Sequence, residues 1–204
     1  MDFDFTKQII PFGIAVICLM VVFYGIYFTK KILQKRKGIK TNQIGSRKEK
    51  GLHATEVLMA IATLSVVVAE LLSVGLGWNY APPSARFTGV LIAGLGDIIF
   101  LIAVVQMKDS WRAGIPKDDK TELVTNGIYK FSRNPAFLGF DFNYIGICLA
   151  YSNPVSIAFT VFAVVMLHMQ ILQEEKYMLS TFGEEYAEYK KEVFRYFGRK
   201  TRKK

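Results

Sequence analysis

Apolar residues in this chain gather into long blocks separated by polar segments, rather than recurring at a helical or strand period. Residues 9–28 carry no charged side chain, and residues 57–76 and 87–107 each carry one carboxylate, Glu70 and Asp97. About 20 consecutive apolar residues in a helix cross the ~30 Å hydrocarbon core of a bilayer. These three blocks therefore predict transmembrane helices.

Two shorter apolar blocks, residues 135–151 and 155–172, are separated by Ser152, Asn153 and Pro154, which are turn-forming residue types. They predict a helical hairpin, so the expected fold is an all-α integral membrane protein with about five transmembrane helices. The first block of the chain could also be read as a signal peptide. Its apolar run is longer than usual for one and no small-residue cleavage site follows, so we expect a retained helix.

The chain after Leu172 alternates charged residues with apolar and aromatic ones, which indicates an amphipathic helix interrupted near Gly183. Such a C-terminal helix would lie on the membrane surface or fold back over the polar segment between Met107 and Pro135. That segment is long for a loop in a compact protein, and long loops are often functional.

The net charge of +9 raises the question of nucleic-acid binding, but the charge distribution favours a membrane. All of the 26 Lys and Arg residues except Lys7 and Arg86 lie between the first and second blocks, between the third and fourth, or after the fifth. The positive-inside rule then predicts an external N-terminus and a cytoplasmic C-terminus. The expected partners are the lipid bilayer, with anionic headgroups at the basic loops, and not nucleic acid.

Metal chemistry and disulfides are not expected. Cys18 and Cys148 lie far apart within apolar blocks, and neither His53 nor His168 has a cysteine at metal-ligand spacing.

Two short motifs suggest chemistry at the cytoplasmic side. Asn134 and Pro135 are favoured residue types for the N-cap and first position of a helix, whose free N–H groups attract anions. Arg133 beside them adds a cation suited to a carboxylate or phosphate. Glu174 and Glu175 close the last apolar block at the same side. Each motif alone also fits an ordinary helix end at the interface.

Taken together, the two motifs are similar to a known signature. Leu123-x-Thr125-x-Gly127-x-Tyr129-x-x-x-Arg133-Asn134-Pro135-x-Phe137-x-Gly139 and Glu174-Glu175-x-x-Met178-x-x-x-Phe182-Gly183-x-x-Tyr186-x-x-Tyr189 resemble the isoprenylcysteine carboxyl methyltransferase family and its phospholipid methyltransferase relatives. The stretch Gln106-Met107-x-x-Ser110-Trp111-Arg112-x-Gly114 resembles the bacterial branch, which implies a prokaryotic inner membrane. The resemblance covers roughly residues 105–197.

The resemblance implies S-adenosylmethionine as the cofactor, bound by a cytoplasmic loop and the first turn of the fourth helix. It divides the chain into residues 1–107, with three helices and the basic loop 30–50, and a catalytic region 108–204 containing the hairpin 135–172. The implied cofactor-binding residues are Glu122, Leu123, Val124, Tyr129, Asn134, Pro135, Ala136, Phe137, Glu174 and Glu175. Charge complementarity, and not the resemblance, assigns Arg133 to the methionine carboxylate. Arg133, Asn134 and Glu174 are the expected catalytic residues.

The acceptor is expected to be lipophilic, and we assign Arg112, Asp141 and Gln170 to its side of the site. Gln170 stands where the eukaryotic relatives have an arginine associated with the acceptor carboxylate, which weakens the case for a free carboxylate acceptor. Asn134 and Phe137 likewise replace His and Tyr. Because the cofactor's methyl group is already activated, the enzyme would mainly align the reactants and exclude water.

Two other functions fit parts of the pattern. An NADPH-dependent membrane reductase of a sterol- or isoprenoid-type lipid would share a related arrangement of motifs, but the chain lacks the larger multi-span body. A non-catalytic lipid-binding or transport protein would explain the apolar blocks and the basic face, but not the paired motifs.

Overall fold

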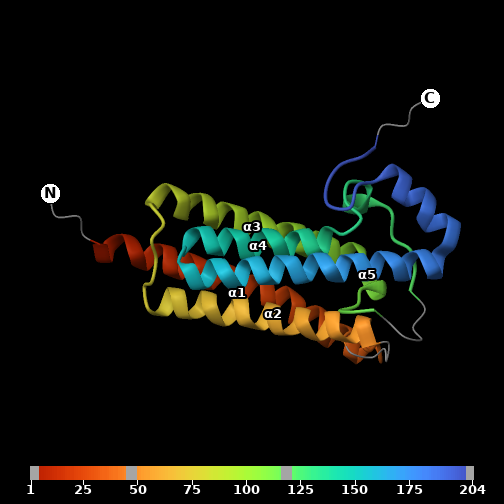
Figure 1. Ribbon diagram of the computed structural model, residues 1–204, viewed down its shortest axis with the longest axis horizontal. Helices are drawn as coiled ribbons and strands as arrows, with labels where there is room; N and C mark the ends of the chain where they lie inside the picture. The colour runs from red at the N-terminus through yellow and green to blue at the C-terminus, as the bar shows by residue number, and fades with distance from the viewer. Residues whose placement is uncertain (1–4, 45–49, 116–120, 201–204) are drawn as a thin grey trace.

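The computed structural model describes residues 5–44, 50–115 and 121–200 (Figure 1). Parts of the predicted basic loop and of the predicted cofactor loop, residues 45–49 and 116–120, lie outside them. The helices are α1 (Phe5–Arg36), α2 (Lys50–Gly75), α3 (Pro83–Gln106), α4 (Pro135–Ala150) and α5 (Pro154–Glu192), with 3₁₀ turns η1 (Lys108–Ser110) and η2 (Gly127–Lys130). Within the described residues, β-structure is limited to the isolated bridges Asn42–Ala113 and Val193–Arg199.

The predicted all-α membrane fold is confirmed, with one helix at each apolar block. By length and composition, α1, α2, α3 and α5 are able to cross a membrane, whereas α4 is a shorter apolar helix of 16 residues. At 1.5 Å per residue α4 extends only about 24 Å. The outward faces of the helices carry exposed apolar side chains such as Val21, Leu72 and Val161, as expected for contact with lipid.

The short α4 is held by an unusually close contact with α3. Gly96 in α3 and Gly139 in α4 face the partner helix so closely that a Cβ on Gly96 would lie 2.6 Å from the Asn143 nitrogen and 2.7 Å from the Gly139 oxygen. Small residues let backbones approach in this way, which substitutes for the hydrophobic effect inside lipid. A hydrogen bond of 2.8 Å from Asn143 Nδ2 to Asp97 Oδ1 lies in the same contact.

The predicted turn of the hairpin between α4 and α5 is built around Asn153. Its side chain accepts hydrogen bonds from the backbone nitrogens of Val155 and Ser156, and the Ser156 hydroxyl accepts one from the Asn153 nitrogen, completing a capping box. The Asn153 amide also donates 2.8 Å to the Ser73 hydroxyl of α2. The turn therefore ties the hairpin to α2 as well as starting α5.

The C-terminal part of α5 folds back on the bundle. This is one of the two predicted arrangements, the other being a helix that lies on the membrane surface. Gly183 has φ 52° and ψ −125°, and this conformation kinks the helix. Beyond the kink, Tyr186, Tyr189 and Val193 are buried together with Leu123 against them. The helix returns over the segment that follows η1, so both predicted motifs end in one region of the molecule (Figure 1).

Candidate functional site

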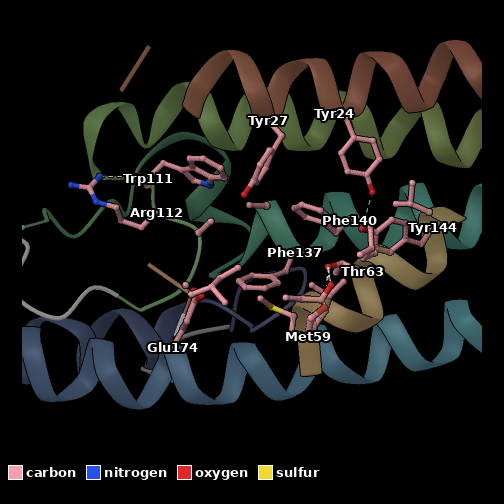
Figure 2. Close-up of a pocket in the computed structure, with 18 of the residues that line it drawn as sticks. Tyr24, Tyr27, Met59, Thr63, Trp111, Arg112, Phe137, Phe140, Tyr144 and Glu174 are labelled. Atoms are coloured by element: carbon pink, nitrogen blue, oxygen red, sulfur yellow. Dashed lines mark hydrogen bonds between the residues drawn. The ribbon is translucent and has the colours of Figure 1, made fainter. Parts of the chain in front are cut away.

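A cavity of about 420 Å³ opens between α1, α2, α4 and α5, next to residues 111–114 (Figure 2). Tyr24 and Tyr27 of α1, Met59 and Thr63 of α2, and Phe137 of α4 form much of its mainly apolar wall. The cavity runs along the bundle between two unlike ends. Trp111, Arg112 and Glu174 lie at one end, and Tyr24 and Tyr144 lie at the other (Figure 2).

Glu174 brings a carboxylate to the first end. It lines the cavity from α5, where Gln170, one helical turn earlier, donates 3.2 Å from its Nε2 to Glu174 Oε1. Gln170 itself is fully buried, and its Oε1 has no hydrogen-bond partner among the described residues. The two predicted residues therefore act as one unit, with Gln170 behind Glu174.

The start of α4 forms the neighbouring wall. The helix begins at Pro135 with Asn134 at the N-cap, as predicted, and Ala136 and Phe137 line the cavity. The Asn134 side chain makes no capping bond. Its Nδ2 instead donates to Glu175 Oε1 at 3.3 Å and to the Arg195 carbonyl at 3.2 Å. Asn134 thus joins α4 to α5 and to the chain that follows it.

Arg133 lies at the centre of a buried ionic network. Its Nη2 is 2.6 Å from Glu175 Oε1, and both side chains are only 4% exposed. Its Nη1 donates to the Val193 carbonyl at 2.7 Å, and Arg195 Nη2 approaches Glu175 Oε2 at 3.0 Å. The adjacent carboxylates of the predicted pair therefore have separate surroundings, because Glu174 lines the cavity whereas Glu175 holds Arg133.

The segment 121–132 lies between the end of α3 and the returning part of α5. The Tyr189 hydroxyl donates 2.6 Å to the Tyr129 carbonyl, and Ile128 donates its N–H to the Gln106 side chain. Tyr129 is buried, and this burial raises the pKa of its phenol well above the ordinary value, so the hydroxyl stays protonated. Leu123 packs on the returning helix, whereas Glu122 is exposed.

Of the remaining predicted residues, Arg112 lines the cavity and the others do not. Arg112 lines the cavity, and its Nη1 donates to the Asp109 and Trp111 carbonyls. Asp141 is buried but does not line the cavity, and its Oδ1 has no partner among the described residues. Glu122, Leu123, Val124 and Tyr129 are also absent from the cavity lining, so their proposed contact with a cofactor stays a prediction.

Sequence analysis missed the contribution of the first two helices. Tyr24, Tyr27 and Phe28 line the cavity with the i, i+3, i+4 spacing of one helix face, and Met59, Thr63 and Val67 do so from α2. An aromatic stripe on an otherwise aliphatic helix was the available signal. The walls of the cavity therefore come from both predicted regions, residues 1–107 and residues 108–204.

Buried Glu56 was missed as well. Its Oε1 accepts a hydrogen bond of 3.1 Å from the Ile115 nitrogen, so α2 fixes the backbone just after the cavity-lining residues 111–114. In the described part of the chain, no group of three His, Cys, Asp or Glu side chains is placed to hold a metal ion.

Comparison with known proteins finds a match over the part of this site that residues 111–114, α4 and α5 contribute. Residues 85–185 match the family model described as phospholipid methyltransferase. A probable protein-S-isoprenylcysteine O-methyltransferase of Oryza sativa subsp. indica is 31% identical over 110 residues, which cover 52% of this chain and 58% of that protein. The range that matches the family model runs from α3 through Glu174 and into the part of α5 beyond the kink.

Two further relatives carry related names. Protein-S-isoprenylcysteine O-methyltransferase of Saccharomyces cerevisiae is 38% identical over 119 residues, or 57% of this chain and 50% of that protein. Its Homo sapiens counterpart is 32% identical over 111 residues, or 52% and 38%. The chain thus spans about half the length of the curated relatives it matches. None of these three is bacterial, and the bacterial affinity expected from residues 106–114 stays a prediction.

Proposed function

Because residues 85–185 match the family model described as phospholipid methyltransferase, we propose that this protein is a membrane methyltransferase that methylates a lipophilic acceptor with S-adenosylmethionine. One observation carries the proposal. Ala136 and Phe137 at the start of α4 and Glu174 of α5, which belong to two separate sequence motifs, line the same cavity.

The residues at this end of the cavity suit the proposed cofactor. S-adenosylmethionine carries a positive sulfonium, and a carboxylate together with the faces of Trp111 and Phe137 favours a cation. The cavity volume of about 420 Å³ falls in the range of roughly 300–1,000 Å³ that is typical of small-molecule sites. When bound, the cofactor supplies an activated methyl group.

The protein's own part is positioning and exclusion of water. Gln170 orients Glu174 through their hydrogen bond, and Arg133 fixes the start of α4 by binding Glu175 and the Val193 carbonyl. Well-oriented reactants in a site without water need little further assistance for a displacement at an activated methyl group. All three guanidinium nitrogens of Arg133 make internal bonds, so its assignment to the cofactor carboxylate stays a prediction.

The acceptor would enter from the bilayer. The cavity is walled by helices whose outer faces are apolar, so a lipid chain can reach it without crossing water. The relatives are named for acting on isoprenylcysteine, and we take an S-isoprenylcysteine as the first acceptor to test. We also propose that the cofactor end faces the cytoplasm, because the basic segments gather at that end of the bundle.

Calorimetry on detergent-purified protein with S-adenosylmethionine and, separately, NADPH tests the function against the reductase alternative. We expect saturable binding of S-adenosylmethionine only, weakened at least tenfold by Glu174→Gln, because one charge-assisted contact is worth about 1.5–3 kcal/mol. Glu188→Gln on the exposed face of α5 is the control and should bind normally. Absence of saturable S-adenosylmethionine binding would overturn the proposal.

Transfer of a labelled methyl group from the cofactor to N-acetyl-S-farnesylcysteine then separates an enzyme from a lipid-binding protein. Binding of this acceptor without any methyl transfer, in protein that also binds the cofactor, would exclude it as the acceptor.

A further inference from the structure

The end of the cavity farthest from Glu174 contains a pair of tyrosine hydroxyls. Tyr24 of α1 and Tyr144 of α4 approach each other with their Oη atoms 3.1 Å apart (Figure 2). Apolar side chains, among them Val67, Phe140 and Leu167, line the cavity around them. The pair therefore places two hydroxyls against an apolar part of the cavity wall.

The pair has unused hydrogen-bonding capacity. Two phenols together have two O–H donors, and the bond between them uses only one. Across the described part of the chain, neither hydroxyl makes another hydrogen bond. One donor and several lone pairs therefore remain, in a place where an unmatched polar group is costly.

Glu70 adds a second unmatched group behind the pair. It lies one helical turn beyond the cavity-lining Val67 of α2 and is only 1% exposed. Both of its carboxyl oxygens lack a hydrogen-bond partner within the described ranges. Buried carboxyl groups within membrane-spanning helices are rare and usually functional.

We propose that the Tyr24–Tyr144 pair binds a second, uncharged oxygen group of the acceptor, a hydroxyl or carbonyl carried within its apolar part. Phe137, next to the reacting end, and Tyr144 are seven residues apart in α4, which places the pair about 10 Å farther along the bundle. The inference rests on the proposed function and favours an acceptor whose apolar part carries oxygen over an S-isoprenylcysteine with a plain hydrocarbon chain. A plain hydrocarbon chain leaves the pair unmatched.

Binding can be measured without catalysis through Trp111, which lines the cavity. The chain has two tryptophans, and Trp78→Phe removes the other, which lies in the α2–α3 connection. The probes are S-dodecyl-N-acetylcysteine and an analogue with a hydroxyl about 10 Å from the sulfur. The quenching of Trp111 fluorescence then reports the affinity of each probe with no cofactor present.

We expect the hydroxylated probe to bind roughly tenfold more tightly, the value of one net hydrogen bond in an apolar site. The double variant Tyr24→Phe/Tyr144→Phe should abolish this preference while leaving binding of the plain probe within about twofold, because both rings and their packing remain. Tyr27→Phe is the matched control, since Tyr27 lines the cavity one turn away on the same helix. It should keep the preference.

Equal affinity of the unsubstituted protein for the two probes, as would follow if water completed the pair, overturns the inference. Loss of the preference in Tyr27→Phe to the same extent overturns it too. The calorimetric test of S-adenosylmethionine is independent of these outcomes. A preference that persists without cofactor binding would support the oxygen site and reject the methyltransferase function, and the converse would reject only the oxygen site.

Discussion

The two sides of α4 are packed in opposite ways. Towards α3, Gly139 and Gly146 bring the two backbones together with almost no side chain between them. Towards α1, α2 and α5, Phe137, Phe140 and Tyr144 border an open cavity. The same short helix is therefore both the most tightly fixed element and a wall of the space for ligands.

This difference shows how one short membrane helix can combine rigid attachment with room for a ligand. Groups that align a reaction must be held within a fraction of an ångström by rigid support. A lipid acceptor, in contrast, needs space and an apolar path. Here the support is concentrated on one side and the space on the other, so substitutions on the two sides should have different consequences.

The largest loss of stability is expected at the anchor of α4. Arg133→Met leaves Glu175 buried without its closest cation, and breaking a buried pair costs about 3–5 kcal/mol. We expect the Tm of the purified protein to fall by about 10 °C or more. The Lys191→Met control removes an exposed pair with Glu188 and should hardly change Tm.

The double variant Arg133→Met/Glu175→Met sharpens this test. It removes both buried charges, so at least half of the lost stability should return. Cofactor affinity in the double variant then distinguishes two roles of Arg133, positioning the start of α4 and binding the cofactor carboxylate. If Arg133 only positions α4, the affinity of the double variant stays within a few-fold of normal. A double variant as unstable as the single one would contradict the network described here.

The next effect is expected in the α3–α4 contact. Gly96→Ala places a methyl group against backbone atoms of α4 that cannot move aside, which should cost about 2 kcal/mol and lower Tm by roughly 6 °C. Gly94→Ala is the control, since its Cβ meets only Leu19 Cδ2 at an ordinary 3.6 Å. A similar loss in both variants would show that helix propensity, and not the close contact, sets the stability.

On the cavity side of the bundle, a larger side chain should change ligand binding more than it changes the stability of the protein. Ala60 lines the cavity, whereas Ala62, two residues along α2, is fully buried in the core. Ala60→Phe should keep Tm nearly unchanged and abolish binding of the lipid probe, while Ala62→Phe should cost about 1–3 kcal/mol. Thermal unfolding and Trp111 quenching measure the two effects. Normal probe binding by Ala60→Phe would mean that the cavity is not the acceptor site.

The smallest effect is expected at an exposed ion pair between Lys37, which follows α1, and Asp109 of η1. Lys37 lies 2.8 Å from Asp109 and lowers the pKa of that carboxyl below its ordinary 3.8. A lowered pKa in the folded state stabilises the protein above the unfolded value, and this contribution is lost as the pH falls below about 4.

A slight extra loss of Tm below pH 4 in low salt should therefore disappear in Asp109→Asn and in high salt, which screens exposed charges. An acid profile in low salt that is the same for Asp109→Asn and for the unsubstituted protein would mean that the pair contributes nothing.

The parts of the fold that sequence predicted are those set by local chemistry. Apolar block length placed the helices, and Asn153 with Pro154 marked the hairpin turn, because capping involves residues only two or three positions apart. The returning C-terminal helix was likewise visible in its alternation and in Gly183. The glycines of the α3–α4 contact were not recognised, although Gly89 and Gly96, like Gly139 and Gly146, lie seven residues apart and so on one helix face.

The site was predicted less completely because its contacts join distant residues. Arg133 and Glu175 are separated by 42 positions, and Tyr24 and Tyr144 by 120. Sequence treated Glu174 and Glu175 as one carboxylate pair, but neighbouring residues on a helix differ by about 100° in direction. Their different surroundings follow from this angle together with the position of the returning helix. That position depends on long-range contacts, which the sequence around Glu174 and Glu175 does not show.

The hydrogen bonds from Arg133 and Asn134 to the Val193 and Arg195 carbonyls have a consequence for biosynthesis. The partners of Arg133 at Val193 come 60 residues later in the chain, after the whole hairpin and the returning helix. A nascent chain can insert all of its apolar helices while the start of α4 still lacks these acceptors. We therefore expect membrane insertion to precede assembly of the site, which would form only once residues 193–195 have been synthesised and released from the ribosome.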